Sequence, residues 1–168
     1  ARGIVVVENV SVAEVESGKD LQEVIDHAMD QRHVSATQMN SESSRSHLII
    51  SVLIETVHAI TGRPTIGKLS LVDLAGSERV GKSGVSGVGM EEAKAINKSL
   101  SALGDVISML NAAQQEKEKA GKNAKSVYIP YRSHPLTHLM SDSLGGNAKT
   151  LMFVNFSPAD YNAAETES

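Results

Sequence analysis

Residues 48–57, LIISVLIETV, are apolar at nearly every position, and this run constrains the fold more than any other part of the sequence. A strand that is apolar on both faces is typical of the centre of a sheet covered on both sides. The segment AITGRPT (59–65) then predicts a turn that reverses the chain. KLSLVDLAG (68–76) predicts a second strand, which places Asp73 at its carboxyl end, shortly before a glycine.

Further strands and helices are predicted by the same kinds of local signal. IVVVENVSV (4–12) and TLMFVNFSP (150–158) are β-branched or apolar runs that predict a first and a last strand. A helix is expected from Asp20, as its cap, to about His33. Alternating strands and helices predict a layered α/β domain, with a central, mostly β-branched sheet and helices on both of its faces.

Two more helices follow in the second half of the chain. The first is predicted from about Met90 to about Leu110 and is followed by a solvated loop, QQEKEKAGKNAKS (114–126). The second begins at Pro135 and is ended by Gly145 and Gly146. The apolar faces of these helices comprise Ala93, Ile96, Leu100, Leu103, Ile107 and Leu110 in the first, and Leu136, Leu139, Met140 and Leu144 in the second.

Composition narrows the class of protein. The chain of 168 residues is 40% apolar and 3% aromatic, which predicts one domain, residues 1–168, with an aliphatic core. It has no cysteine, so a disulfide framework and a cysteine-ligated zinc site are excluded. No apolar run approaches the roughly 18 residues of a membrane helix. The net charge of −4 argues against nucleic acid as a partner, whereas six bases against three acids in residues 116–149 suit an acidic partner.

Two polar segments carry the chemistry. An acid at the end of an apolar strand, as at Asp73, is suited to hold the water shell of magnesium, and Gly76 lets a backbone N–H approach a terminal phosphate. NSESSRSH (40–47) offers paired hydroxyls at Ser43 and Ser44 and a guanidinium at Arg45, which suit the detection of a γ-phosphate. The alternative interpretation of Asp73 and Gly76 is an ordinary turn after a strand, and that of NSESSRSH is a serine-rich loop that caps a strand.

Together NSESSRSH and LVDLAGSE (71–78) resemble the switch I and switch II motifs of the kinesin superfamily. The resemblance continues through SGVSGVGMEEAKAINKSLSALGDVISML (83–110), VYIPYR (127–132) and LTHLMSDSLGGNAKTLMFVNFSP (136–158), so it covers nearly the whole chain. RHVSATQMNSESSRSHLI (32–49) and FVNFSPADYNAAET (153–166) look most like C-terminal-motor kinesins, including the calmodulin-binding type.

The resemblance implies part of a microtubule-stimulated ATPase of the kinesin-type P-loop NTPase fold, with ATP and Mg²⁺ as ligands. It implies switch I at 40–47, switch II at 73–89, a relay helix at about 90–110 and a microtubule-binding loop and helix at about 125–144. The phosphate loop of kinesins lies N-terminal to this segment, so the isolated chain is expected to be nearly inactive. Cytoplasm and cytoskeleton are the expected locations, without a membrane partner. Dimerisation and calmodulin control would depend on regions outside the chain.

The roles of single residues also come from the resemblance. In kinesins the corresponding serines contact phosphate and magnesium, which implies these roles for Ser43 and Ser44, and Asn40 helps to order the loop. Arg45 and Glu78 would form the salt bridge that closes over the γ-phosphate. The surface that meets acidic tubulin would comprise Lys94, Lys98, Lys125, Tyr131, Arg132 and His138. Pro135 departs from the usual pattern, in which a lysine stands there, so microtubule affinity is expected to be lower or pH-sensitive through His138.

Other interpretations remain open. GSERVGKS (76–83) fits a phosphate-loop pattern, which would make Lys82 a phosphate ligand in a self-sufficient nucleotide-binding protein. A microtubule-binding module without turnover is a second alternative. His134, His138 and Asp142 are spaced four apart, which would suit a metal site on one helix, but no further ligand is evident. Packing or hydrogen bonding is the expected role of His47 and His58.

Overall fold

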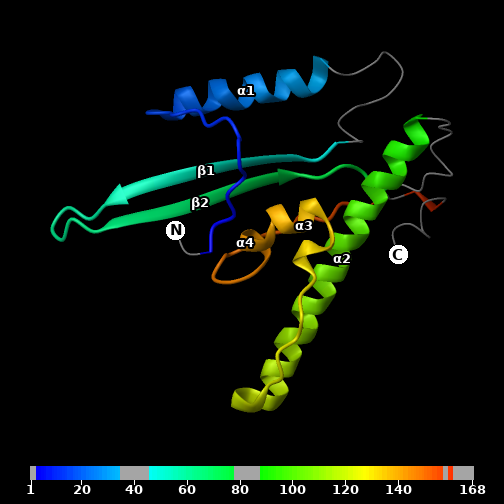
Figure 1. The fold of residues 1–168 in the computed structure, drawn as a ribbon. Helices are drawn as coiled ribbons and strands as arrows, with labels where there is room; N and C mark the ends of the chain where they lie inside the picture. Colours follow the sequence, from blue (N-terminus) through cyan, green and yellow to red (C-terminus); the bar gives the residue numbers. More distant parts are fainter. Residues whose placement is uncertain (1–2, 35–45, 78–87, 157–158, 161–168) are drawn as a thin grey trace. The chain divides into compact units, whose positions relative to one another are not determined.

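The computed structural model describes residues 3–34, 46–77, 88–156 and 159–160. The chain divides into two compact units, Ala1–Gly76 and Ser77–Ser168. Its elements mix helices with one sheet, which agrees with the predicted α/β class (Figure 1). Among the described residues, no helix combines the length and the apolarity needed to cross a bilayer.

In the first unit, residues 3–17 are described without helix or strand and lead to helix α1 (Gly18–Val34). The cap of this helix is Ser17 rather than the predicted Asp20. The Asp20 N–H donates to Ser17 Oγ at 3.2 Å, and Asp20 Oδ2 accepts from the Glu16 N–H at 3.2 Å. The first bond satisfies one of the amides that a helix N-terminus leaves without an intrahelical partner, and the second ties the residue before the cap to the first turn.

Strands β1 (Leu48–Val57) and β2 (Pro64–Asp73) form a long antiparallel hairpin (Figure 1). Their register runs from Leu48 opposite Asp73 to Val57 opposite Pro64. The predicted turn closes the far end, where the His58 N–H donates to the Arg63 carbonyl at 3.0 Å. His58 Nδ1 also accepts from the Ile60 and Thr61 N–H groups, both at 3.2 Å, which confirms a hydrogen-bonding role for this histidine.

The sheet is smaller and more exposed than the sequence predicts. Its described strands are β1 and β2, and the side chains of Leu53, Val57 and Leu69 are 55%, 69% and 51% exposed. The prediction that β1 is buried on both faces is therefore wrong for the described structure. A strand is buried on both faces only when other elements pack on both sides of its sheet. The apolar sequence of β1 favours such packing but does not provide those elements.

The predicted strands at 4–12 and 150–158 are also wrong over their described residues, 4–12 and 150–156. Residues 4–12 and 151–156 are described without strand pairing, and Val12 and Phe153 are 77% and 79% exposed. The β-propensity of a segment expresses how well it fits a pleated, partly buried surface, so it requires a neighbouring strand. The described sheet provides no such neighbour for these two segments.

In the second unit, α2 (Val88–Ala120) begins close to the predicted start but extends past the predicted end near Leu110. The segment expected to be a loop contains strong helix formers, and Gln114 Nε2 donates to Glu118 Oε1 at 2.8 Å along it. Gly121 ends the helix with a φ of +56°, a conformation that glycine adopts without a steric penalty. The short η3 helix (Gly121–Asn123) follows.

The chain then runs back alongside α2 (Figure 1). The Lys125 N–H donates to Glu116 Oε1 at 3.3 Å. Further along, Tyr128 and Pro130 share a hollow of about 310 Å³ with three residues of α2. These three residues are Asp105, Ser108 and Met109.

The buried core of the second unit lies where α2 packs against α3 (Pro135–Leu139). Val106 is fully buried, and Leu103 and Leu136 are 4% and 5% exposed. The buried face of α2 is turned slightly from the predicted stripe, because Ile107 is 38% exposed. The buried residues of α2 are Ser99, Ala102, Leu103 and Val106.

The predicted helix from Pro135 to Leu144 is divided into α3 and α4 (Ser141–Leu144), with Met140 between them. Ser141 Oγ donates to the His138 carbonyl at 2.8 Å, and this local bond competes with the backbone bond that a continuous helix would make there. Met140 is buried, but Leu139 is 37% exposed, so the predicted apolar face is only partly correct.

Candidate functional site

The open end of the β1–β2 hairpin brings the two motif segments together. Because Leu48 pairs with Asp73, the chain that enters β1 and the chain that leaves β2 lie at the same end of the sheet. The described part of NSESSRSH is its last two residues, Ser46 and His47, and they immediately precede β1. The described part of LVDLAGSE ends at Ser77. The register therefore places the end of NSESSRSH next to the end of LVDLAGSE, although the two segments are far apart in the sequence.

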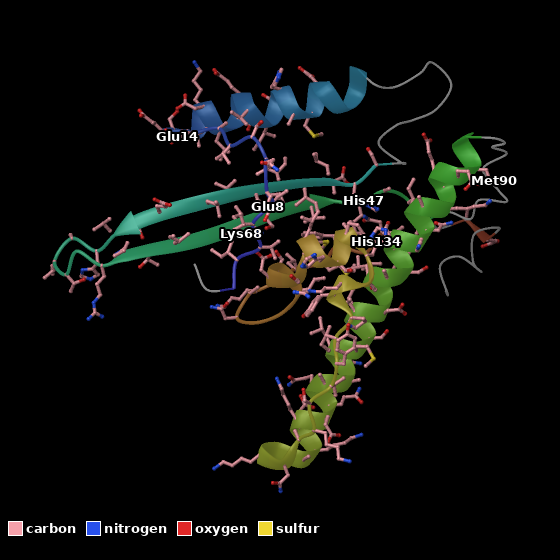
Figure 2. The ribbon with its side chains drawn as sticks, in the orientation of Figure 1. Glu8, Glu14, His47, Lys68, Met90 and His134 are labelled. Carbon is pink, nitrogen blue, oxygen red and sulfur yellow. The ribbon has the colours of Figure 1, made fainter. Side chains whose placement is uncertain are left out.

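A hydrogen bond joins these two segments directly. The Ala75 N–H donates to His47 Nδ1 at 3.0 Å in a partly buried setting. Figure 2 labels His47 at the start of β1, at the end of the hairpin opposite the turn. Ala75 itself is 5% exposed. The bond confirms that His47 is a hydrogen-bonding residue, although the sequence did not identify its partner.

Asp73 and Gly76 occupy the positions expected of them after the strand. Asp73 is the last residue of β2 and is exposed, and Gly76 lies three residues further on and is partly buried. A carboxylate oxygen is the type of ligand that Mg²⁺ prefers, either directly or through its water shell. The role of Asp73 in magnesium binding stays a prediction. Among the described residues, no group of three or more His, Asp or Glu side chains is arranged to hold a metal ion by itself.

The other predicted residues of the nucleotide site lie outside the described residues. They are Asn40, Ser43, Ser44, Arg45 and Glu78. Most of the alternative phosphate-loop segment GSERVGKS, including Lys82, lies outside them as well. Helix α2 begins at Val88, five positions after Ser83.

The predicted cationic surface is distributed over α2, the segment after it and the η4–α3 region. Lys94 is on α2 and forms an exposed ion pair with Glu91, with 2.8 Å between Nζ and Oε1. Lys98 is exposed on the same helix. Exposed ion pairs of this kind contribute little to stability, so Lys94 remains available to a charged partner. Lys125 is exposed in the segment that runs back along α2.

Helix η4 (Tyr131–Ser133) holds two further predicted residues, Tyr131 and Arg132. The single O–H of Thr137 is shared between the Tyr131 carbonyl, 2.7 Å from Oγ1, and the His134 carbonyl, 2.9 Å from it, and Thr137 is fully buried. These bonds fasten η4 onto α3, which carries the exposed His138. Burial raises the pKa of the Tyr131 phenol above its ordinary value of 10.0.

The metal-site alternative at His134, His138 and Asp142 is not supported by the backbone. His134 Nδ1 accepts from the Leu136 N–H at 3.2 Å and so caps α3 (Figure 2). Asp142 belongs to α4, beyond the interruption at Met140, so the three residues do not share one continuous helix. A spacing of four places residues on one face only while the helix continues.

A model of the kinesin motor domain family matches residues 1–168. The chain belongs to the kinesin family. It is 54% identical over 166 residues to kinesin-like protein KIN-14E of Arabidopsis thaliana and, over the same length, 54% identical to kinesin-like protein KIN-14I of Oryza sativa subsp. japonica. In both cases 99% of the chain is covered. These kinesin-14 relatives confirm the predicted resemblance to C-terminal-motor kinesins.

Solved kinesin motor domains share the fold. The chain superposes on the structure of a KIF14 dimer in its two-heads-bound state with a TM-score of 0.77 and 39% identity, covering 96% of the chain and 44% of that structure. That dimer is in complex with a microtubule and AMP-PNP. The motor domain of a Kar3-like kinesin from Ashbya gossypii matches with a TM-score of 0.70 and 38% identity, covering 99% of the chain and 46% of that structure. The chain spans only 12% of the length of the two plant relatives.

Proposed function

We propose that this kinesin segment senses the γ-phosphate of ATP and couples its hydrolysis to microtubule binding and movement. The observation that carries the proposal is the meeting of the two motif segments at one end of the β1–β2 hairpin. Leu48 pairs with Asp73 there, and His47 accepts a hydrogen bond from Ala75. A phosphate sensor needs both segments at a single phosphate position, and this register supports that requirement.

The proposed roles at the nucleotide follow the family motifs. Ser43 contacts phosphate, Ser44 and Asp73 hold Mg²⁺, with Asp73 acting through water, and Asn40 orders the first loop. The Gly76 N–H meets the terminal phosphate. Mg²⁺ neutralises charge on the phosphate oxygens when it is bound.

The salt bridge between Arg45 and Glu78 acts as the gate over the γ-phosphate. Phosphoryl transfer is catalysed mainly by positioning and by stabilising charge. Loss of the gate therefore reduces turnover more than nucleotide binding. The ATPase activity is stimulated by microtubules and belongs to the complete motor, with residues 1–168 proposed as the C-terminal part of its motor domain.

The proposed microtubule surface comprises α2 and the η4–α3 region. Its exposed cations suit acidic tubulin, and α2 and α3 pack together through a buried core that holds them as one body. The structural match to a KIF14 dimer in complex with a microtubule supports this assignment. The surface residues are Lys94, Lys98, Lys125, Tyr131, Arg132 and His138. The protein would then act on the cytoskeleton in the cytoplasm.

The proposal is tested by measuring ATP hydrolysis and microtubule cosedimentation for residues 1–168 alone and for the complete motor. The complete motor should hydrolyse ATP faster with microtubules than without them, and the isolated segment should show negligible turnover. ATP-independent cosedimentation of a complete motor that lacks turnover would instead identify a binding module. Strong ATP binding by the isolated segment that is lost on Lys82→Ala would identify GSERVGKS as a phosphate loop.

A further inference from the structure

His47 joins the two phosphate-sensing segments through an atom that the proposed chemistry does not use. Its Nδ1 accepts the Ala75 N–H at 3.0 Å, and the two residues are 28 positions apart in the sequence. We infer that His47 is a positioning residue, which fixes the backbone of switch II beside Gly76 relative to the end of switch I. This inference rests on the proposed function for its effect on turnover, but the bond itself can be tested without it.

The chemistry of the bond limits which side chains can replace His47. Because Nδ1 accepts a hydrogen bond from a backbone amide, that nitrogen carries no hydrogen, and the neutral ring carries its hydrogen on Nε2. Ala75 is buried, and a buried amide without an acceptor is unfavourable. Removal of the acceptor would therefore drive the Ala75 amide towards another partner and shift the backbone of residues 74–76.

The other histidine–backbone bonds in the described residues show why this one is different. His58 Nδ1 accepts from Ile60 and Thr61, and His134 Nδ1 accepts from Leu136. Each of these bonds is local, because its donor lies within three positions of the histidine that accepts it. The His47 bond instead joins two segments that a switch must move or hold together, so its loss has a consequence beyond local stability.

That consequence falls on Gly76. The next amide after Ala75 is the Gly76 N–H, which is proposed to meet the terminal phosphate. The bond holds the peptide unit between Leu74 and Ala75. The next peptide unit carries the Gly76 N–H and is linked to it only through the φ and ψ angles of Ala75, so a shift of the first unit changes the direction of the Gly76 N–H. Because the phosphate contact matters most when charge develops during transfer, misdirection of this amide should lower kcat much more than it raises KM for ATP.

The test uses three substitutions at His47 in the complete motor. Asn places an acceptor oxygen close to the position of Nδ1, Gln places its polar atoms one bond further out, and Leu has no acceptor. We expect His47→Leu and His47→Gln to lower microtubule-stimulated kcat by roughly tenfold to a hundredfold, the range typical of a misplaced group, with KM for ATP changed by less than about threefold. His47→Asn should restore most of the lost rate.

His58→Leu is the matched control. It removes an Nδ1 acceptor of backbone N–H groups at the opposite end of the same two strands, and His58 is exposed. It should leave kcat unchanged. Wild-type kcat in His47→Leu would overturn the inference, as would an equal loss in His47→Asn and His47→Leu.

Hydrogen exchange separates this inference from the proposed function. The Ala75 amide should exchange slowly in the wild type and in His47→Asn, and clearly faster in His47→Leu. Unchanged protection in His47→Leu would overturn the positioning role even in an active motor. If the wild-type complete motor hydrolyses no ATP, the proposed function fails, and the exchange result still decides whether His47 holds the switch II backbone.

Discussion

The Tyr131 hydroxyl occupies the space that a side chain at Gly145 would need. A Cβ atom built on Gly145 would collide with Tyr131 Oη and would lie 3.4 Å from the Ser141 carbonyl oxygen. The absence of a side chain at residue 145 therefore allows η4 and the end of α4 to approach closely. These elements belong to the region that carries the proposed microtubule-binding residues Tyr131, Arg132 and His138.

Gly145→Ala is expected to destabilise the second unit. The added methyl must displace the Tyr131 ring, and overpacking of this kind typically costs about 1–3 kcal/mol. Gly104→Ala is the matched control, because Gly104 is exposed on α2 and a Cβ there meets nothing within 4 Å. It should stabilise the helix by about 0.5–1 kcal/mol. Denaturant unfolding of the two variants would measure both changes, and equal effects would contradict the packing argument.

Titration of Tyr131 tests its burial. Burial raises the pKa of the phenol in the folded state, because the charged phenolate is poorly solvated there. The folded state therefore holds its proton more tightly than the unfolded state does. The resulting contribution to stability is complete below the ordinary pKa of about 10 and is lost as the pH rises through the higher folded value.

Ultraviolet difference absorption of tyrosinate would follow this titration. Tyr131→Phe should remove the component that ionises latest, while Tyr128→Phe, which changes a tyrosine that is 75% exposed, should leave it in place. If the latest component survives in Tyr131→Phe, the raised pKa does not belong to Tyr131.

Charge on the exposed face of α2 should control microtubule affinity. Lys98→Ala in the complete motor removes one cation from the proposed surface and is expected to weaken binding by about twofold to fivefold at low salt, with a smaller effect as ionic strength rises. Lys19→Ala removes an exposed lysine from α1, where Lys19 pairs with Glu23 at 3.6 Å, and should change affinity little. Cosedimentation across a salt series would measure both, and equal losses would argue for a nonspecific charge effect.

Local signals in the sequence predicted local structure well. The start and end of α1, the reversal between β1 and β2 and the cap region before α3 depend on nearby residues, and they form close to where the sequence places them. The predicted end of α2 near Leu110 is wrong because glutamine, glutamate, lysine and alanine in the charged segment that follows also favour helix. Gly121 was the better signal for the end of this helix.

Strand pairing could not be predicted in the same way. The valines of 4–12 and the apolar residues of 150–158 have the composition of strands, but pairing depends on neighbours that a local pattern does not specify. The same limit applied to the site. The positions of Asp73 and Gly76 after a strand follow from the sequence, and their roles at the nucleotide stay predictions. The partner of His47 instead depends on the register that sets Leu48 opposite Asp73.

The most direct test of the motor assignment is the microtubule-stimulated ATPase rate of a complete motor carrying Glu78→Ala, compared with Glu23→Ala on the exposed face of α1. If Glu78 and Arg45 close over the γ-phosphate, Glu78→Ala should abolish microtubule stimulation while ATP still binds, and Glu23→Ala should keep the wild-type rate. A near-normal stimulated rate in Glu78→Ala would contradict the account.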